Sequence, residues 1–469
     1  MDHRAVEEIK DVGPVEAFER LRRLGGAFIM TRDRLEGLSY VGAAPACVVA
    51  TGRRGVTFVG GRATTCPDPF AAVGEILKRR ATTTPPASGI PFTGGAVGYF
   101  SYDLKDLVTP VKAGTFEQKT PAAPLAPLAP LATVGIYDVV YVYDHAGGRG
   151  LLLSSGGPGS EGRFEAVLNA LRGPAPPDRD RPEGGGDTVA RAAAPSSNFT
   201  REAYIAAVDR AKDYISEGDI YQINLSQRLA MDIASDPADL YGTLLRESPA
   251  PFSTLLDCGP FQVVSNSPER LLSAADGWLE TSPIKGTRPR GATPELDRAL
   301  IEELRGSVKE RAEHVMIVDL ERNDLGMVSA PGTVEVVEFE RVETLPGLHH
   351  MVSTVRGKIA GGLGPLDCLR AAFPGGSITG APKIRAMEII DEIETVERSI
   401  YTGGIGWAGF DGAMDIAMAI RTGIVAGSTL HLHVGGGIVA DSVPEDEYEE
   451  TLLKARDFLD AAGAGRACI

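Results

Sequence analysis

The strongest constraint on the fold of this chain is a break in pattern at residues 173–198, GPAPPDRDRPEGGGDTVARAAAPSSN. A segment so rich in proline, glycine and charge cannot bury enough apolar surface to offset its ordering entropy. We therefore predict a linker there, between an N-terminal lobe of residues 1–172 and a second domain of residues 199–469. The chain, at 469 residues, is too long for one ordinary core, so two lobes or one large sandwich are expected.

The two sides of this linker differ in their hydrophobic pattern. Before it, apolar and β-branched residues alternate or run together in short segments, which indicates a strand-rich lobe. After it, segments with helical spacing alternate with short β-branched runs. Strands are predicted at 94–104, 134–144, 151–155, 220–229, 414–427 and 429–441, and helices at 204–219, within 303–326, from Pro382 and from Pro444. This order predicts an α+β fold with antiparallel strands.

Charge and cysteine content narrow the class of protein. Asp and Glu number 63 against 47 Lys and Arg, a net charge of −16, whereas proteins that bind a phosphate backbone concentrate basic residues on one face. We predict no nucleic-acid partner, and an anionic ligand would need local cations or a metal. The five cysteines form no C-x-x-C pair, and no segment reads as a signal peptide or a membrane span. A cytoplasmic protein without membrane contact is predicted.

The acidic segment DSVPEDEYEETLLKAR, residues 441–456, is a candidate metal site. Asp441 or Ser442 can cap a helix that starts at the following proline, which places Glu447 and Glu450 on one helical face. Two carboxylates on one turn can bind a hard cation such as Mg²⁺. The alternative is a solvated acidic first turn that the helix dipole favours.

A second acidic helix, KERAEHVMIVDLERND at residues 309–324, places Glu313 beside an apolar run. A carboxylate next to such a run tends to lie at the edge of the core. Glu313 is therefore a candidate third metal ligand. Its alternative is a pairing with a basic residue four positions away on a surface helix.

Two glycine-rich segments are candidate ligand sites. FPGGSITGAPKIRAM, residues 373–387, lacks the G-K-[ST] ending of a phosphate loop, although small residues that run into a helix start can still bind an anion through backbone N–H groups. HVGGGIVAD carries three glycines at 435–437 after a strand, which lets a ligand approach the backbone closely. For each segment the alternative is a tight turn.

Two further polar residues stand in apolar surroundings. Arg421 lies in AMAIRTGIV, which reads as an apolar strand, and a buried guanidinium there needs a carboxylate from a ligand or from the protein. His350 lies in LHHMVSTVRG and can donate to a ligand or satisfy a hydrogen bond in the core.

The ordered set of segments resembles one known family. The segments are DIYQINLSQR, SNSPERLL, SPIKGTRPRG, ERAEHVMIVDLERNDLG, HHMVSTVRG, PGGSITGAPKIRAMEIID, YTGGIGW, AMAIRT and GGGIVADSVPEDEYEET. From about residue 200 to the C-terminus, the chain is similar to the chorismate-utilising enzymes, which include anthranilate, aminodeoxychorismate, isochorismate and salicylate synthases. The resemblance implies a large α/β sandwich on two antiparallel sheets, with the N-terminal lobe packed beside the catalytic half.

The resemblance also implies a set of site residues. One carboxylate of chorismate would bind Mg²⁺, whose ligands would be Glu313, Glu447 and Glu450. The other carboxylate would be bound by Arg421, Tyr401 and the backbone amides near Gly436 and Gly437. The ring pocket would be lined by Thr287, His350 and Ser377. A metal would explain how an acidic protein binds a dianion.

Two positions distinguish members of this family. Relatives that use water carry a lysine base where this chain has Gln222, as in members that use ammonia, so isochorismate and salicylate synthesis are not expected. Anthranilate synthases look like PIAGT at the second position, whereas aminodeoxychorismate synthases resemble the PIKGT of this chain, which contains Lys285. Without the resemblance, Gln222 would be an ordinary strand amide and Lys285 a packed lysine paired with a glutamate.

A lysine at this position has a chemical rationale. Ammonia that attacks C2 of chorismate, with loss of the C4 hydroxyl, leads to anthranilate. To place nitrogen at C4, the amine of Lys285 would attack C2 first, and ammonia would then attack C4 and expel it. The amine must be neutral, and burial near Mg²⁺ would lower its pKa. Glu269 would protonate the departing hydroxyl and needs a raised pKa; the alternative is an ion pair with Arg270.

These implications predict a transferase that makes aminodeoxychorismate, a precursor of p-aminobenzoate in folate or specialised metabolism. Cys258 lacks the strand-turn-helix setting of an amidotransferase nucleophile, so ammonia is expected from a glutamine amidotransferase subunit or from solution. The rivals are the anthranilate synthase large subunit, whose reaction releases pyruvate, and a non-catalytic chorismate-binding subunit. Thr31 and Arg32 stand where relatives inhibited by tryptophan carry Glu and Ser, and no tryptophan site is predicted.

Overall fold

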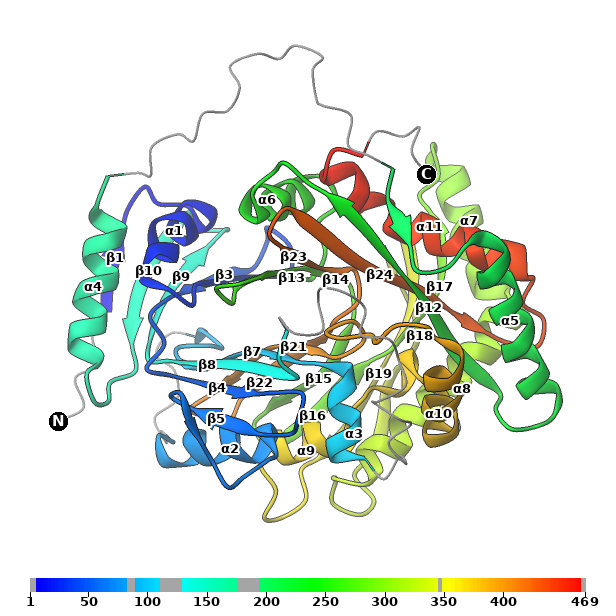
Figure 1. The fold of residues 1–469 in the computed structure, drawn as a ribbon, viewed down its shortest axis with the longest axis horizontal. Helices are drawn as coiled ribbons and strands as arrows, with labels where there is room; N and C mark the ends of the chain where they lie inside the picture. Colours follow the sequence, from blue (N-terminus) through cyan, green and yellow to red (C-terminus); the bar gives the residue numbers. More distant parts are fainter. Residues whose placement is uncertain (1–5, 82–88, 110–128, 175–193, 345–347, 465–469) are drawn as a thin grey trace, which may run out of the picture.

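Two large sheets form the centre of the molecule. The computed structural model describes residues 6–81, 89–109, 129–174, 194–344 and 348–464. In this part of the chain the strands form two twelve-stranded sheets, and the pairings are antiparallel. Helices surround the two sheets (Figure 1). The expected α+β sandwich on two antiparallel sheets is confirmed.

The strands of each sheet follow an order that differs from their order in the chain. Sheet A runs β1 (Val6–Ile9), β10 (Arg149–Ser154), β9 (Val139–Asp144), β3 (Leu38–Gly42), β2 (Phe28–Arg32), β13 (Phe252–Asp257), β14 (Gln262–Ser267), β23 (Thr422–Ala426), β24 (Thr429–Ile438), β12 (Gln222–Asp232) and β11 (Ser196–Ser197), with β20 (Gly380–Ala381) beside β12. Sheet B runs β17 (Ile284–Pro289), β19 (Leu348–Lys358), β16 (Trp278–Ser282), β15 (Arg270–Ala275), β22 (Met414–Met418), β21 (Gly404–Gly409), β7 (Gly95–Phe100), β8 (Ala132–Tyr137), β4 (Cys47–Thr51), β5 (Thr57–Val59) and β6 (Arg62–Ala63), with β18 (Glu335–Thr344) beside β19.

Both sheets combine strands from either side of the predicted linker. In sheet A, β2 pairs with β13, and in sheet B, β7 pairs with β21. The early and late parts of the chain therefore share both sheets. The linker predicted at 173–198 lies largely outside the described residues, because 175–193 are not among them.

The space between the sheets is filled through the period-2 alternation of the strands. On β2, Phe28 and Met30 belong to an apolar cluster that draws on strands of both sheets and on no helix, whereas Ile29 between them belongs to a different cluster. That second cluster packs sheet A against four helices: α1 (Pro14–Leu21), α4 (Ser160–Arg172), α6 (Pro237–Glu247) and α11 (Pro444–Ala461).

The remaining helices cover sheet B and the start of β12. A third apolar cluster joins sheet B to α2 (Pro69–Arg79), α8 (Val308–Gly326) and α9 (Pro365–Ala372), and a fourth joins β12 to α5 (Arg201–Ser216) and α10 (Lys383–Ile393). Two more helices, α3 (Lys105–Val108) and α7 (Pro294–Gly306), complete the set drawn in Figure 1. None of the helices in the described ranges is long and apolar enough to cross a membrane.

The start of α11 differs from its prediction in one respect. The helix begins at Pro444 as expected, but the residue that precedes it, Val443, is the N-cap and makes no side-chain capping bond. Ser442 Oγ instead accepts a hydrogen bond of 3.1 Å from the backbone N–H of Val439. The predicted cap by Asp441 or Ser442 is therefore wrong.

Gly98 on β7 tests how tightly sheet B is packed. It lies between Val134 of β8 and Gly406 of β21, and a methyl group on its Cα would collide with the carbonyl oxygen of Thr133. We expect Gly98→Ala to lower the free energy of unfolding by about 1–3 kcal/mol, measured in urea, because an overpacked strand must shift its neighbours. Gly162→Ala on α4, where a methyl group meets open space, should instead stabilise by about 0.5–1 kcal/mol. Equal changes in the free energy of unfolding for the two substitutions would contradict the close packing described at Gly98.

Candidate active site

Residues 435–437 of β24, here called the triglycine segment, are surrounded by polar side chains. A methyl group on Gly435 would lie 2.9 Å from Tyr401 Oη, one on Gly436 would lie 3.2 Å from Glu447 Oε2, and one on Gly437 would lie 2.7 Å from Gln222 Nε2. The segment is part of the β24 ladder with β12 and does not form a turn. Glycine here leaves room beside the backbone that any side chain would occupy.

Gln222, the first residue of β12, has an unusual environment for an amide. Its side chain is only 1 % exposed, and neither its Nε2 nor its Oε1 has a hydrogen-bond partner. An ordinary strand amide would be satisfied by its surroundings, because an unpaired buried polar group costs about 1–3 kcal/mol. The amide instead faces Gly437, where it can bond to a ligand.

Lys285 lies near the same glycine. Its Nζ is 3.6 Å from the position of a methyl group on Gly437. The residue sits on β17 beside an irregularity in the ladder with β19, where Gly286 has a φ of +74°. Burial lowers the pKa of Lys285, and the nearby carboxylates of Glu313 and Glu269 raise it without cancelling the effect of burial. A lowered pKa increases the neutral, nucleophilic fraction of the amine.

Glu269 is buried between β14 and β15. Its Oε1 accepts a hydrogen bond of 2.9 Å from Ser377 Oγ, on the short helix η4 (Gly376–Ile378). Burial raises the pKa of Glu269 to about 7, although the hydrogen bond from Ser377 and the charge of Lys285 lower it. The alternative pairing with Arg270 is not formed, because Arg270 Nε donates to Asp415 Oδ1 at 2.9 Å. A carboxyl group with this pKa can donate a proton near neutral pH.

The acidic residues of α8 and α11 approach the site from outside the sheets. Glu447 and Glu450 face Gly436 from one turn of α11, and Glu313 of α8 acts on the pKa of Lys285. Among the described residues, no three His, Cys, Asp or Glu side chains converge closely enough to hold a metal ion. Glu447 and Glu450 therefore lie beside the triglycine segment, and the described glutamates do not form a closed metal site.

Lys454 is a site residue that sequence reasoning missed. Its Nζ donates to the carbonyl oxygen of Gly435 at 2.9 Å and pairs with Glu450 Oε1 at 2.6 Å. The signal available in the sequence was the spacing of four residues from Glu450, which places both side chains on one face of α11. The amine brings a positive charge to the triglycine segment in an otherwise acidic surrounding.

Arg421 is placed differently from its prediction. It lies between β22 and β23, not inside a strand, and its backbone has a φ of +48°. Its Nη1 donates to the carbonyl oxygen of Lys454 at 2.9 Å, and burial lowers its pKa. The expectation of a strand position is wrong, because the chain turns here to pass from sheet B to sheet A.

Thr287 and His350 form a pair across β17 and β19. Thr287 Oγ1 lies 3.0 Å from His350 Nδ1, and the two residues are direct partners in the ladder. Burial, with a smaller contribution from the charge of Arg421, lowers the pKa of His350 to about 4. The imidazole is therefore neutral at physiological pH and can either donate or accept a hydrogen bond.

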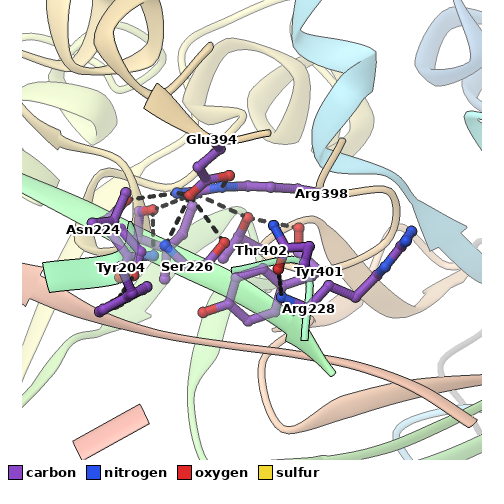
Figure 2. A network of polar contacts seen from close by, with 11 residues as sticks. Tyr204, Asn224, Ser226, Arg228, Glu394, Arg398, Tyr401 and Thr402 are labelled. Atoms are coloured by element: carbon purple, nitrogen blue, oxygen red, sulfur yellow. Dashed lines mark hydrogen bonds and ion pairs between the residues drawn. The ribbon is translucent and has the colours of Figure 1, made fainter. Parts of the chain in front are cut away.

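Tyr401 is held by a buried ion pair that the sequence did not single out. Its ring stacks on His433 with centroids 5.5 Å apart, and burial raises its pKa to about 12. Figure 2 shows Arg398 beside it, bonded to Glu394 and to Asn224. The two Arg398 contacts from Nη2, to Glu394 Oε1 and to the Asn224 carbonyl oxygen, are both 2.6 Å. The spacing of four residues between Glu394 and Arg398 was the only signal for this pair.

The chain is similar to several known proteins. A family described as "chorismate binding enzyme" matches residues 26–460. The chain is 42% identical over 407 residues to anthranilate synthase component 1 of Pseudomonas aeruginosa, covering 84% of this chain and 80% of that protein. It is 40% identical over 372 residues to aminodeoxychorismate synthase component 1 of Bacillus subtilis, covering 78% and 76%. The solved structure of anthranilate synthase component I from Streptococcus pneumoniae matches with a TM-score of 0.76 and 30% identity, covering 90% and 92%.

The raised pKa of Glu269 predicts a pH-dependent cost in stability. The folded protein keeps this proton up to about pH 7, whereas an unfolded glutamate loses it near its ordinary value of 4.5, so stability falls as pH rises between the two values. We expect Glu269→Gln to be more stable than the parent at about pH 8, by up to about 3 kcal/mol in urea denaturation, with the difference vanishing near about pH 4.5. If the free energy of unfolding changed with pH in the same way for both proteins, the raised pKa of Glu269 would be contradicted.

Proposed function

This chain belongs to the family of chorismate-binding enzymes, and from that premise we propose that it aminates chorismate at C4 with ammonia to give 4-amino-4-deoxychorismate. The observation that carries the proposal is the position of Lys285, whose amine lies beside Gly437 and the unpaired amide of Gln222. No water-activating lysine stands at position 222, which favours ammonia as the nucleophile.

Two successive displacements account for a product with nitrogen at C4. The neutral amine of Lys285 bonds to C2 while the C4–O bond breaks, and Glu269 gives its proton to the departing hydroxyl, which leaves as water. Ammonia then bonds to C4 while the C2–N bond to Lys285 breaks, which restores the lysine amine. The new C4 ammonium group returns one proton to Glu269. The sum is chorismate plus ammonia giving aminodeoxychorismate plus water.

The lowered pKa of Lys285 and the raised pKa of Glu269 support these roles. Both shifts have burial as their largest cause, so loss of solvent favours a neutral base and a protonated acid at the same pH. Thr287, His350 and Ser377 would line the ring of the substrate. Tyr401, Arg421 and the backbone N–H groups at Gly436 and Gly437 would bind a carboxylate.

Two carboxylates beside Gly436 have the chemistry of Mg²⁺ ligands. Carboxylate oxygens are the ligands that this hard cation prefers, and Glu447 and Glu450 both face Gly436. The ammonium group of Lys454, paired with Glu450, occupies the same acidic surrounding. We propose Glu313, Glu447 and Glu450 as the ligands, with the bound ion neutralising one carboxylate of chorismate.

A second candidate function is supported by the names of the relatives. Anthranilate synthase component 1 is the name carried by the Pseudomonas aeruginosa protein and by the Streptococcus pneumoniae structure, and the relatives as a group favour this function over aminodeoxychorismate synthesis. In that reaction ammonia would attack C2 directly and pyruvate would leave. Lys285 would then only contribute charge. The two candidates differ in product and share the site.

The term component 1 in the names of these relatives implies a second component. We propose a glutamine amidotransferase subunit as the partner that supplies ammonia. A high concentration of ammonium salt should replace this subunit in an assay of the isolated chain.

Lys285→Ala tests the covalent route. We expect aminodeoxychorismate formation to fall by at least about 10²-fold, or the product to shift to anthranilate with release of pyruvate, because the alanine variant has no amine to occupy C2. Products are separated by mass after incubation with chorismate, Mg²⁺ and an ammonium salt. Lys285→Arg, which keeps the charge but not the nucleophile, should behave as the alanine variant does. Full aminodeoxychorismate activity in either variant would overturn the route.

Glu450→Gln tests the proposed metal ligands. We expect the Mg²⁺ concentration for half-maximal turnover to rise by at least about 10-fold, because a carboxylate ligand becomes a neutral amide. Glu449→Gln is the matched control, since Glu449 lies on the same helix but points to Arg201 at 3.8 Å. If both variants keep the parental Mg²⁺ dependence, Glu450 is not a ligand.

A further inference from the structure

The loop of residues 394–403, between α10 and β21, adopts an unfavourable backbone conformation at two positions. Ser399 has a φ of +54° and Thr402 a φ of +62°. Residues other than glycine rarely adopt such angles, and they persist only where the surrounding structure holds them in place. Gly403, which follows, also packs closely, because a methyl group there would collide with the carbonyl oxygen of Phe100.

Three consecutive residues after β7 hold the backbone of Ser399. The Ser399 carbonyl oxygen accepts hydrogen bonds from Ser101 Oγ at 2.8 Å and from the Tyr102 backbone N–H at 2.9 Å. The Ser399 N–H donates to Asp103 Oδ2 at 3.0 Å. Ser101, Tyr102 and Asp103 therefore satisfy both backbone polar groups of the strained residue, and we call this set the 101–103 clamp.

Ion pairs also join the N-terminal half to α10 and to the 394–403 loop. Lys105, which is 2 % exposed, places its Nζ 2.6 Å from Asp106 Oδ1 and 2.6 Å from Asp391 Oδ2 of α10. Arg53 of the N-terminal half pairs with Glu397 of the loop. The loop is therefore attached to the N-terminal half at Glu397 as well as at Ser399, and the helix before it is attached at Asp391.

The other side of the loop faces the candidate active site. Arg398 precedes Ser399 and bonds to β12 through the Asn224 carbonyl oxygen, as seen in Figure 2. Tyr401 follows two residues later, with its hydroxyl 2.9 Å from the position of a methyl group on Gly435. A change in the backbone at Ser399 would therefore move both a buried arginine and the phenol that faces the triglycine segment.

We propose that the 101–103 clamp positions Tyr401 for substrate binding, with Asp103 as the principal positioning residue. This inference rests on the proposed function, because Tyr401 is assigned there to a carboxylate of chorismate. It assigns to the N-terminal half a part in substrate affinity that acts through Tyr401. Removing the Asp103 carboxylate frees the Ser399 N–H, and the loop relaxes from its strained angle.

The test compares substitutions at Asp103 in the full chain. We expect Asp103→Ala to raise KM for chorismate by about 10-fold while kcat changes by less than about threefold, from chorismate consumption with Mg²⁺ and saturating ammonium. Asp103→Asn keeps an acceptor oxygen for the Ser399 N–H, and burial already raises the pKa of Asp103 to about 7. The asparagine variant should therefore keep KM within about twofold of the parent.

A control separates positioning from general loosening of the N-terminal half. Asp138 is also buried there and pairs with Arg163 and Arg80, away from the 394–403 loop. Asp138→Ala should lower the thermal midpoint and leave KM unchanged. If Asp103→Ala fails to fold, Ser101→Ala is the second variant. It removes the bond from Ser101 Oγ to the Ser399 carbonyl oxygen and the bond that Ser101 Oγ accepts from the Asp103 N–H, and it should raise KM by about threefold.

The outcomes separate the two proposals. An unchanged KM in Asp103→Ala would overturn the proposal that the 101–103 clamp positions Tyr401, and it would leave the proposed function intact. Where only Ser101→Ala folds, an unchanged KM in that variant has the same meaning. A KM that rises equally in Asp138→Ala would also overturn it. A parent chain that consumes no chorismate would overturn the proposed function itself. Because chorismate consumption is measured, the result does not depend on which amination product forms.

Discussion

The bare backbone of the triglycine segment is the constraint on which the site depends. Side chains from four elements or loops converge on these three residues: Gln222 from β12, Lys285 from β17, Tyr401 from the 394–403 loop and Glu447 from α11. A side chain on β24 at this point would fill the space that they enclose. The two-sheet sandwich brings them together, because β12 and β24 belong to one sheet and β17 to the other.

Burial acts on the charges of this region in two opposite ways. Around Glu269 and Lys285, loss of solvent is the largest cause of the pKa shifts and favours the neutral forms. Arg398 and Glu394 are 1 % and 4 % exposed, and there an ion pair and several hydrogen bonds compensate the loss of hydration. The reactive groups are therefore poised for proton transfer, while Arg398 and Glu394 are fixed by their mutual contacts.

The sequence predicted the elements that carry the strongest periodic signals. The helix that ends near Gly218, the strand that follows it and the final helix from Pro444 all form as expected, and so does the sandwich of antiparallel sheets. Local details were less accessible. Pro382 is the N-cap of α10 and not part of its first turn, and Arg421 lies in a connection between strands. Apolar spacing cannot reveal where a chain crosses from one sheet to the other.

Residue patterns alone marked part of the candidate site, such as Glu447 and Glu450, and family-like segments were needed for the reactive residues. Glu269, Lys285 and Gln222 were named from such segments, and the structure places Lys285 and Gln222 against the same glycine. Lys454, Arg398 and the 101–103 clamp carry no comparable signal, because their partners are distant in sequence or lie within a charged helix.

The most direct test of the central claim is the amount of pyruvate released per chorismate consumed by the unaltered chain with Mg²⁺ and an ammonium salt. No pyruvate, together with a product that retains the enolpyruvyl group, is the predicted result, whereas anthranilate with stoichiometric pyruvate would contradict the role proposed for Lys285.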